Sequence, residues 1–199
     1  MCVIGDTGSG KTTLMYGRGK LVGLLDYRKH AISLRSKGDD AKWISAKRVF
    51  SALPSMDDPR MLHIELFPKR GRELSEFSSA IDRIWSQKGG WAVYFDESYH
   101  ADKLLKLRPK IDDLMTRGRS LGITVINGLQ RPVGVSRFSI SQAKHVISFG
   151  QEGRDAKTIG EATTPRIVPL LEGLRRYQFV WFERADKKLW VGSLQDLQL

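Results

Sequence analysis

Hydrophobic and polar residues alternate along the chain in blocks that predict strands separated by helices. Short, continuously apolar runs of the kind that form buried strands lie at 2–4 and 91–95, and a further mainly apolar strand is expected at 123–128. The clearest helix lies at 73–87, where apolar residues recur at helical spacing and would form one buried face. Strands that alternate with helices are typical of a three-layer α/β fold with a mainly parallel sheet. We therefore expect a single domain of this class over residues 1–199.

The other predicted elements have weaker patterns. Strands are expected at 30–34, 61–66 and 146–149, and a C-terminal β-hairpin is expected from strands at 177–183 and 189–192. Helices are expected at 15–25, 45–53, 101–117 and 153–162, with a loop or short helix at 165–174. Pro109 would kink or restart the third of these helices. Trp181 and Trp190 of the hairpin are expected in the core, and stacking on a base or covering an interface are the alternatives.

The first candidate site follows the first predicted strand directly. Residues 5–12 fit the phosphate-loop pattern G-x-x-x-x-G-K-[ST] at every fixed position. Glycines let backbone N–H groups curl around a phosphate, and a helix that starts here adds its positive end. Lys11 would place a charge on the β- and γ-phosphates, and the Thr12 hydroxyl can ligate Mg²⁺. The expected nucleotide-binding residues are Gly5, Asp6, Thr7, Gly8, Ser9, Gly10, Lys11, Thr12 and Thr13.

The second candidate site is a pair of acids, Asp96 and Glu97, at the end of the apolar run 91–95. A buried parallel strand delivers such carboxylates to its C-terminal end, where ligands collect. Asp96 would hold Mg²⁺ opposite Thr12, and Glu97 would polarise the attacking water as a catalytic residue. A strand followed by an acidic helix cap is the alternative for this segment taken alone. The two motifs together favour a site for Mg-ATP, because the phosphate loop and the acidic strand end are both needed to hold it.

Further polar residues are placed where they could act on the nucleotide. Gln130 follows the strand at 123–128 and could sense the γ-phosphate or orient water. Lys37 and Asp39 follow another predicted strand and could lie near the nucleotide, although a solvated turn is the simpler reading. An arginine finger supplied to a neighbouring subunit is expected from Arg117 or Arg119, with Arg131 a weaker candidate. A salt bridge or a DNA contact is the alternative role for these arginines.

Composition narrows the possible partners. The chain has 33 Lys and Arg residues against 22 Asp and Glu, a formal net charge of +11, which favours a polyanion such as nucleic acid. Basic residues cluster at 69–72 and 103–110, where they could face DNA or simply be solvated. The single Cys2 excludes an internal disulfide and a cysteine metal cluster, and the four histidines lack metal-ligand spacing.

Targeting and membrane signals are not evident in the sequence. No apolar run approaches the ~18 residues that a transmembrane helix needs, and we see no signal peptide. The phosphate loop begins at residue 5, so we expect either a minimal protein or one that lacks an N-terminal module.

The order of these motifs resembles that of the HerA/FtsK-type ATPases over roughly residues 3–160. The resemblance is carried by the phosphate loop, Phe95-Asp96-Glu97, the Arg-Gly-Arg-Ser-Leu-Gly stretch at 117–122, Gln130-Arg131-Pro132 and the Val135–Asp155 stretch. Members of this group are ring-forming motors that translocate or package DNA, including packaging ATPases of membrane-containing viruses and some phage assembly proteins. We expect a bare motor core without accessory modules, which resembles the viral packaging branch more than the chromosome-segregation branch.

The resemblance implies a RecA-like P-loop fold, the cofactors ATP and Mg²⁺, and a homo-oligomeric ring that acts on double-stranded DNA. It further implies capsid or membrane-associated viral proteins as partners, in the host cytoplasm or the virion. We therefore expect an ATP-hydrolysing DNA translocase, most simply a viral genome-packaging motor. Two alternatives stay open: a phage assembly or secretion ATPase acting on protein at a membrane, and a non-motor nucleotide switch or kinase.

Overall fold

The computed structural model describes residues 1–37, 48–87, 89–135 and 137–197. The chain forms two compact units. The first unit consists of Met1–Leu24 and Asn127–Leu199, and the second unit is Leu25–Ile126. Both units contain parallel strands and helices, so the predicted α/β class is confirmed. The expectation of a single domain over residues 1–199 stays a prediction.

The sheet of the first unit is built around β1 (Cys2–Ile4), which is completely buried. β1 pairs in parallel with the end of β8 (Thr124–Leu129) on one side and with β9 (His145–Phe149) on the other. β10 (Gln178–Glu183) joins β9 in the antiparallel sense, and β11 (Lys188–Ser193) completes the C-terminal hairpin that the sequence predicts. The C-terminal ends of β8, β1 and β9 therefore lie along one edge.

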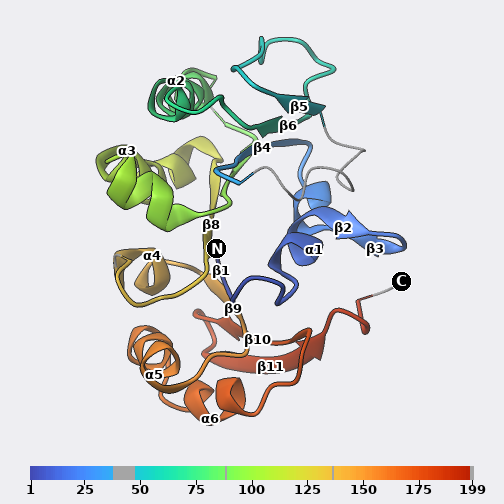
Figure 1. Cartoon of the computed structure of the whole chain (residues 1–199), viewed down its shortest axis with the longest axis vertical. Coiled ribbons are helices and arrows are strands. Elements are labelled where there is room, and N and C mark those ends of the chain that lie inside the picture. Colours follow the sequence, from blue (N-terminus) through green and yellow to red (C-terminus); the bar gives the residue numbers. More distant parts are fainter. Residues whose placement is uncertain (38–47, 88, 136, 198–199) are drawn as a thin grey trace. The chain divides into compact units, whose positions relative to one another are not determined.

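Helices of the first unit cover its sheet on both faces, as expected for three layers (Figure 1). α1 (Lys11–Tyr16) lies on one face. The other face carries α4 (Arg137–Ser141), α5 (Gly153–Ala162) and α6 (Ile167–Glu172). The core on that second face includes Ile159, Leu171 and Phe182, which are at most 1% exposed.

The second unit contains four parallel strands in the order β7-β4-β6-β5. Their bounds are Trp91–Phe95 for β7, His30–Leu34 for β4, His63–Leu66 for β6 and Arg48–Phe50 for β5. α2 (Glu73–Ser86) and α3 (Arg108–Thr116) lie on one face of this sheet (Figure 1). Short turns of helix in the described part of this unit are η1 (Leu24–Tyr27), the π-helical η3 (His100–Leu104) and η4 (Gly118–Leu121).

The predicted helix at 15–25 is wrong beyond Tyr16. At Gly17 the backbone takes a φ of 74°, and the chain turns into a small hairpin of β2 (Gly17–Arg18) and β3 (Leu21–Val22). Gly23 lets this hairpin return close to the end of α1, because a Cβ there would lie 2.3 Å from the carbonyl carbon of Tyr16. Glycines that weaken a helix here provide the turn and the close approach instead.

The predicted helix at 45–53 is also wrong where it can be compared. Residues 45–47 lie outside the described residues, and 48–50 form the strand β5, which pairs with β6. Sheet pairing overrides the local pattern here, as it commonly does for a short segment with β-branched and aromatic side chains.

The predicted helix at 101–117 is divided into η3 and α3. The break lies at Lys106, whose φ of 55° is incompatible with a continuous helix. Pro109 lies in the first turn of α3, so the expected restart at this proline is confirmed.

The tryptophan pair of the hairpin is not in the core. Trp181 and Trp190 are 38% and 43% exposed. They are direct cross-strand neighbours, with ring centroids 5.5 Å apart, and the Trp181 indole N–H donates to His145 Nδ1 at 3.2 Å. The prediction of core packing is therefore wrong, because the two rings pack on each other across an exposed face.

Candidate functional site

The phosphate loop leaves the buried end of β1 and enters α1. The Gly5 N–H donates to the Leu129 carbonyl at 3.0 Å, which ties the start of the loop to β8. Gly8 and Gly10 have φ angles of 78° and 112°, which favour glycine. Gly10 also permits close packing, because a Cβ there would lie 2.5 Å from Leu194 Cδ1. The glycine spacing of the motif is thus required by the backbone path.

Lys11 lies inside the loop and is only 9% exposed. Its ammonium donates to the carbonyl of Gly5 and, at 3.1 Å, to that of Asp6. The hydroxyl of Ser9 is buried and has no hydrogen-bond partner among the described residues. A buried ammonium and an unsatisfied hydroxyl in a glycine loop fit a phosphate group, which accepts hydrogen bonds from both. Thr12 and Thr13 follow in the first turn of α1, half-buried.

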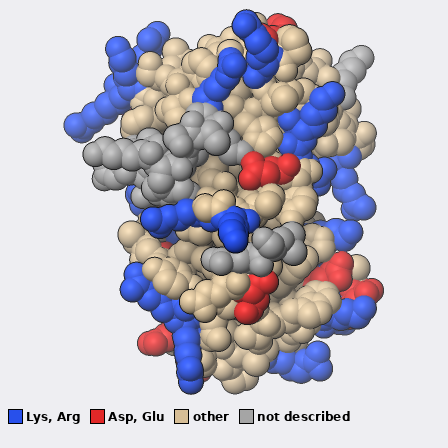
Figure 2. Space-filling model, turned by 90° about the vertical axis from the view of Figure 1, so that its right-hand side faces the viewer, with Lys and Arg blue, Asp and Glu red and all other residues tan. Residues whose placement is uncertain are grey.

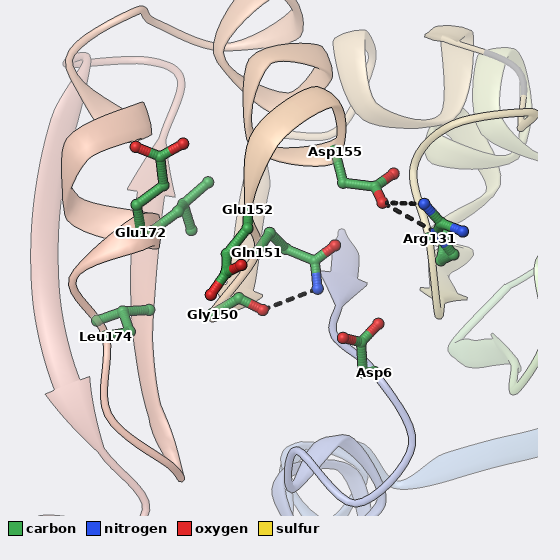
Figure 3. Close-up of a pocket in the computed structure, with 9 residues that line it drawn as sticks. Asp6, Arg131, Gly150, Gln151, Glu152, Asp155, Glu172 and Leu174 are labelled. Atoms are coloured by element: carbon green, nitrogen blue, oxygen red, sulfur yellow. Dashed lines mark hydrogen bonds and ion pairs between the residues drawn. The ribbon is translucent and has the colours of Figure 1, made fainter.

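Gln130 follows β8, next to the phosphate loop along the same edge of the first unit, and is half-buried. The neighbouring Arg131 donates from Nε and Nη2 to Asp155 Oδ2, at 2.9 and 2.8 Å (Figure 3). Asp155 Oδ1 also accepts from the Val133 N–H at 3.2 Å, and Asp155 is 8% exposed. The segment after Gln130 is therefore anchored to α5, and Arg131 is engaged within its own unit.

An acidic pocket of about 660 Å³ lies between this anchor and the phosphate loop (Figure 3). Its charged lining residues are Asp6, Arg131, Glu152, Asp155 and Glu172. Gln151 also lines it and donates from Nε2 to the Gly150 carbonyl at 2.8 Å. The excess of carboxylates makes this pocket unsuited to the phosphates themselves.

The two predicted acids of the second unit stand at the end of β7 and have different partners. The Tyr94 hydroxyl donates to Asp96 Oδ1 at 3.1 Å, and Tyr94 is completely buried. Burial, followed by the charge of Asp96, raises the pKa of Tyr94 well above its usual value, so the phenol stays a donor. Glu97 Oε2 lies 3.5 Å from Lys37 Nζ, with Glu97 12% and Lys37 55% exposed. Asp39 lies outside the described residues.

Two further charged residues near these acids are not predicted by the sequence. Arg35, directly after β4, and Glu65, in β6, are each 1% exposed. Arg35 donates to the Lys37 carbonyl at 3.1 Å, and the charge of Glu65 contributes to the raised pKa of Tyr94. The sequence offers one signal for the buried Arg35, which is its position immediately after a buried strand. That position alone is also typical of the first residue of a loop.

The arginine-finger candidates differ in their surroundings. The Arg117 guanidinium pairs with Asp113 and lies 5.3 Å from the centroid of the Trp85 ring. The hydrogen bond to Asp113 raises the pKa of Arg117. Arg119 is exposed and has no ion-pair partner within the described part of the chain. Ion pairs within the chain therefore count against Arg117 and Arg131 more than against Arg119.

The basic clusters are exposed, with one exception. Lys69, Arg70 and Arg72 lie on an exposed turn before α2, and Lys103 and Lys106 are exposed in and after η3. Lys110 instead pairs with Asp82. Figure 2 shows one face of the molecule, on which Lys and Arg side chains project at many separate places and acidic side chains are fewer. No helix within the described ranges has both the length and the apolar character that crossing a membrane requires.

The first unit and its loop together define a P-loop fold. A phosphate loop that follows a buried parallel strand and opens a helix is the P-loop motif, and the same unit contains the antiparallel C-terminal hairpin. No protein-family model matches the sequence, and no curated protein matches it. Solved structures do match.

The chain is similar to B204, the DNA-packaging ATPase from Sulfolobus Turreted Icosahedral Virus, with 18% identity and a TM-score of 0.74 over 96% of this chain and 95% of that one. It is similar to the genome packaging NTPase B204 from Sulfolobus turreted icosahedral virus 2, in complex with AMP, with 15% identity and a TM-score of 0.75 over 96% and 95% of the chains. It is also similar to the type VII secretion ATPase EccC from Thermomonospora curvata, with 13% identity and a TM-score of 0.59 over 96% of this chain and 25% of that one. These similarities confirm the predicted fold.

Proposed function

We propose that this protein hydrolyses Mg-ATP to move double-stranded DNA, as the genome-packaging motor of a virus. The observation that carries the proposal is the buried Lys11 ammonium inside a loop shaped by Gly8 and Gly10. This arrangement supplies a positive charge and a curled backbone where a triphosphate would bind. The packaging function stated for B204, which has a similar fold, supports the DNA part.

Each site residue has a role in the proposed reaction. Gly5 to Thr13 bind the phosphates, with Lys11 on the β- and γ-phosphates. Thr12 and Asp96 hold Mg²⁺, which when bound neutralises charge on the phosphates. Glu97 polarises the attacking water, and Gln130 orients that water or senses the γ-phosphate. Arg119, or less favourably Arg117, acts in the site of a neighbouring subunit.

Two substitutions test the hydrolytic part. Lys11→Ala is expected to lose nucleotide binding, because it removes the charge that faces the phosphates. Glu97→Gln is expected to keep ATP affinity and to lose turnover by about 100-fold or more, because an amide cannot act as the base. Calorimetric binding and phosphate release measure the two effects, with the exposed Glu161→Gln as the matched control. Equal turnover of Glu97→Gln and the parent would contradict the assignment.

The partners form the second part of the proposal. Copies of the chain would assemble into a homo-oligomeric ring around the duplex, and capsid or membrane-associated viral proteins would recruit it in the host cytoplasm or the virion. The net charge of +11 and the exposed basic residues support a nucleic-acid track.

A second candidate function is an assembly or secretion ATPase that acts on protein at a membrane. The similarity in fold to the secretion ATPase EccC favours it. Weak binding of duplex DNA that does not depend on salt would support this candidate over the DNA motor, because contacts with phosphates are strongly salt-dependent.

A further inference from the structure

Residues 175–178, which lead from α6 into β10, form a tight turn in the first unit. The Gln178 N–H donates to the Arg175 carbonyl at 3.0 Å, and the Arg175 N–H donates to Gln178 Oε1 at 2.8 Å. The Tyr177 carbonyl accepts from the Leu194 N–H at 3.0 Å. The turn is therefore fixed by two backbone hydrogen bonds and by one to the Gln178 side chain, which hold Arg176 and Tyr177 in defined positions.

Tyr177 has a backbone conformation that is strained for a residue with a side chain. Its φ is 66°, at the third position of the turn, where glycine or asparagine is usual. The residue is 37% exposed, so burial in the core does not offset the strain. A strained, partly exposed aromatic residue is a candidate for a role in binding where it also lines a cavity, since backbone strain clusters at binding sites.

The Tyr177 ring lies beside the phosphate loop. A Cβ built on Gly10 would be 3.3 Å from Tyr177 Cδ1, and the Arg176 guanidinium lies over the ring, 4.8 Å from its centroid. A pocket of about 360 Å³ is lined by residues 6–9 of the loop and residues 174–178 of the turn. The aromatic surface and the phosphate-binding backbone thus face one cavity.

We propose that Tyr177 and Arg176 form the subsite for the base of the bound nucleoside triphosphate, with the base stacked on the Tyr177 ring. This inference rests on the proposed function, because it requires a triphosphate in the loop. Bases stack on tyrosine rings and on arginine planes, and one stack changes affinity by about 5- to 150-fold. The exposed charges of Arg175 and Arg176 add attraction for the polyphosphate.

The test compares ATP with inorganic tripolyphosphate, which has no base. Calorimetry in Mg²⁺ buffer measures the affinity of each for the parent protein and for Tyr177→Gly. The substitution is expected to weaken ATP binding by about 5- to 150-fold and to leave tripolyphosphate binding unchanged. It is also expected to raise the urea midpoint, because glycine adopts a positive φ without strain. Tyr177→Phe keeps the ring and should bind ATP like the parent.

Lys187→Gly is the matched control. Lys187 also has a positive φ, 52°, but lies in the turn between β10 and β11 and does not line the pocket. This variant should raise the urea midpoint and change neither affinity. Unchanged ATP binding by Tyr177→Gly, equal weakening of both ligands, or a lower urea midpoint would each overturn the base subsite. A parent protein that binds neither ligand would overturn the proposed function itself.

Discussion

Single residues around the end of β7 determine how its two acids are presented. Asp96 accepts a hydrogen bond from Tyr94, and Glu97 faces Lys37. A neutral phenol adds no charge beside Asp96, whereas an ammonium attracts the Glu97 carboxylate electrostatically. The two neighbouring acids are thus suited to different tasks, which agrees with the proposed roles of metal ligand and base.

Lys37 is expected to position Glu97. Lys37→Ala should lower kcat by about two- to fivefold without changing ATP affinity, because partly exposed pairs contribute at most about 1 kcal/mol. Lys37→Arg should restore part of the loss, since it retains the charge. Steady-state phosphate release gives kcat, and Lys29→Ala, an exposed lysine of the same unit, is the control. An unchanged or higher kcat in Lys37→Ala would exclude this role.

At the scale of elements, α5 supports the segment that follows β8. Asp155→Ala removes the acceptor of the Val133 N–H and of Arg131. The expected loss in free energy of unfolding is about 1–3 kcal/mol, because the part-buried Val133 N–H loses its hydrogen bond to a charged acceptor. Glu161→Ala on the same helix is the control, since the Glu161 pair with Arg137 is exposed and should contribute less than about 1 kcal/mol. Urea unfolding measures both, and equal losses would show that the anchor is unimportant.

Elements whose own residues determine their structure could be predicted from the sequence. The strand Cys2–Ile4 and the helix Gly153–Ala162 lie where the pattern places them. β5 could not be predicted, because its strand conformation depends on pairing with β6. The burial of Arg35 and Glu65 could not be predicted either, since a charged side chain is buried only where tertiary structure supplies partners. The phosphate loop could be predicted because its chemistry depends on local spacing.

At the scale of the whole molecule, we expect each ATP site of the proposed ring to receive an arginine from the neighbouring subunit. Arg119→Ala subunits, mixed with Lys11→Ala subunits, should recover part of the ATPase activity, because each variant supplies what the other lacks. An arginine finger can contribute about 10³- to 10⁵-fold in rate, so each variant alone should be nearly inactive. A mixture of Arg117→Ala and Lys11→Ala subunits tests the second arginine-finger candidate in the same way. If assembly is intact and neither mixture recovers activity, the shared-site model is wrong.

DNA binding is expected to be electrostatic and independent of sequence. The logarithm of the binding constant should fall by roughly 0.9 per logarithmic unit of salt for each phosphate contacted, and duplex DNA should raise the ATPase rate. Neutralising Lys103, Lys106 and Lys110 together should flatten this slope and uncouple hydrolysis from DNA. Lys110→Gln alone should have little effect on the slope, because Lys110 pairs with Asp82. An assembled ring that neither binds duplex at low salt nor responds to it would exclude the DNA motor.

The division of the chain also has a consequence for the order of events during synthesis. Residues 25–126 are continuous, so the strands of the second unit can pair while the ribosome is still adding the rest. β1 must wait, because its partners begin at Asn127 and Val146. Closing so long a segment costs more conformational entropy than local pairing does. The apolar Cys2-Val3-Ile4 segment and the phosphate loop behind it therefore leave the ribosome before the second unit does, but acquire their structure after it.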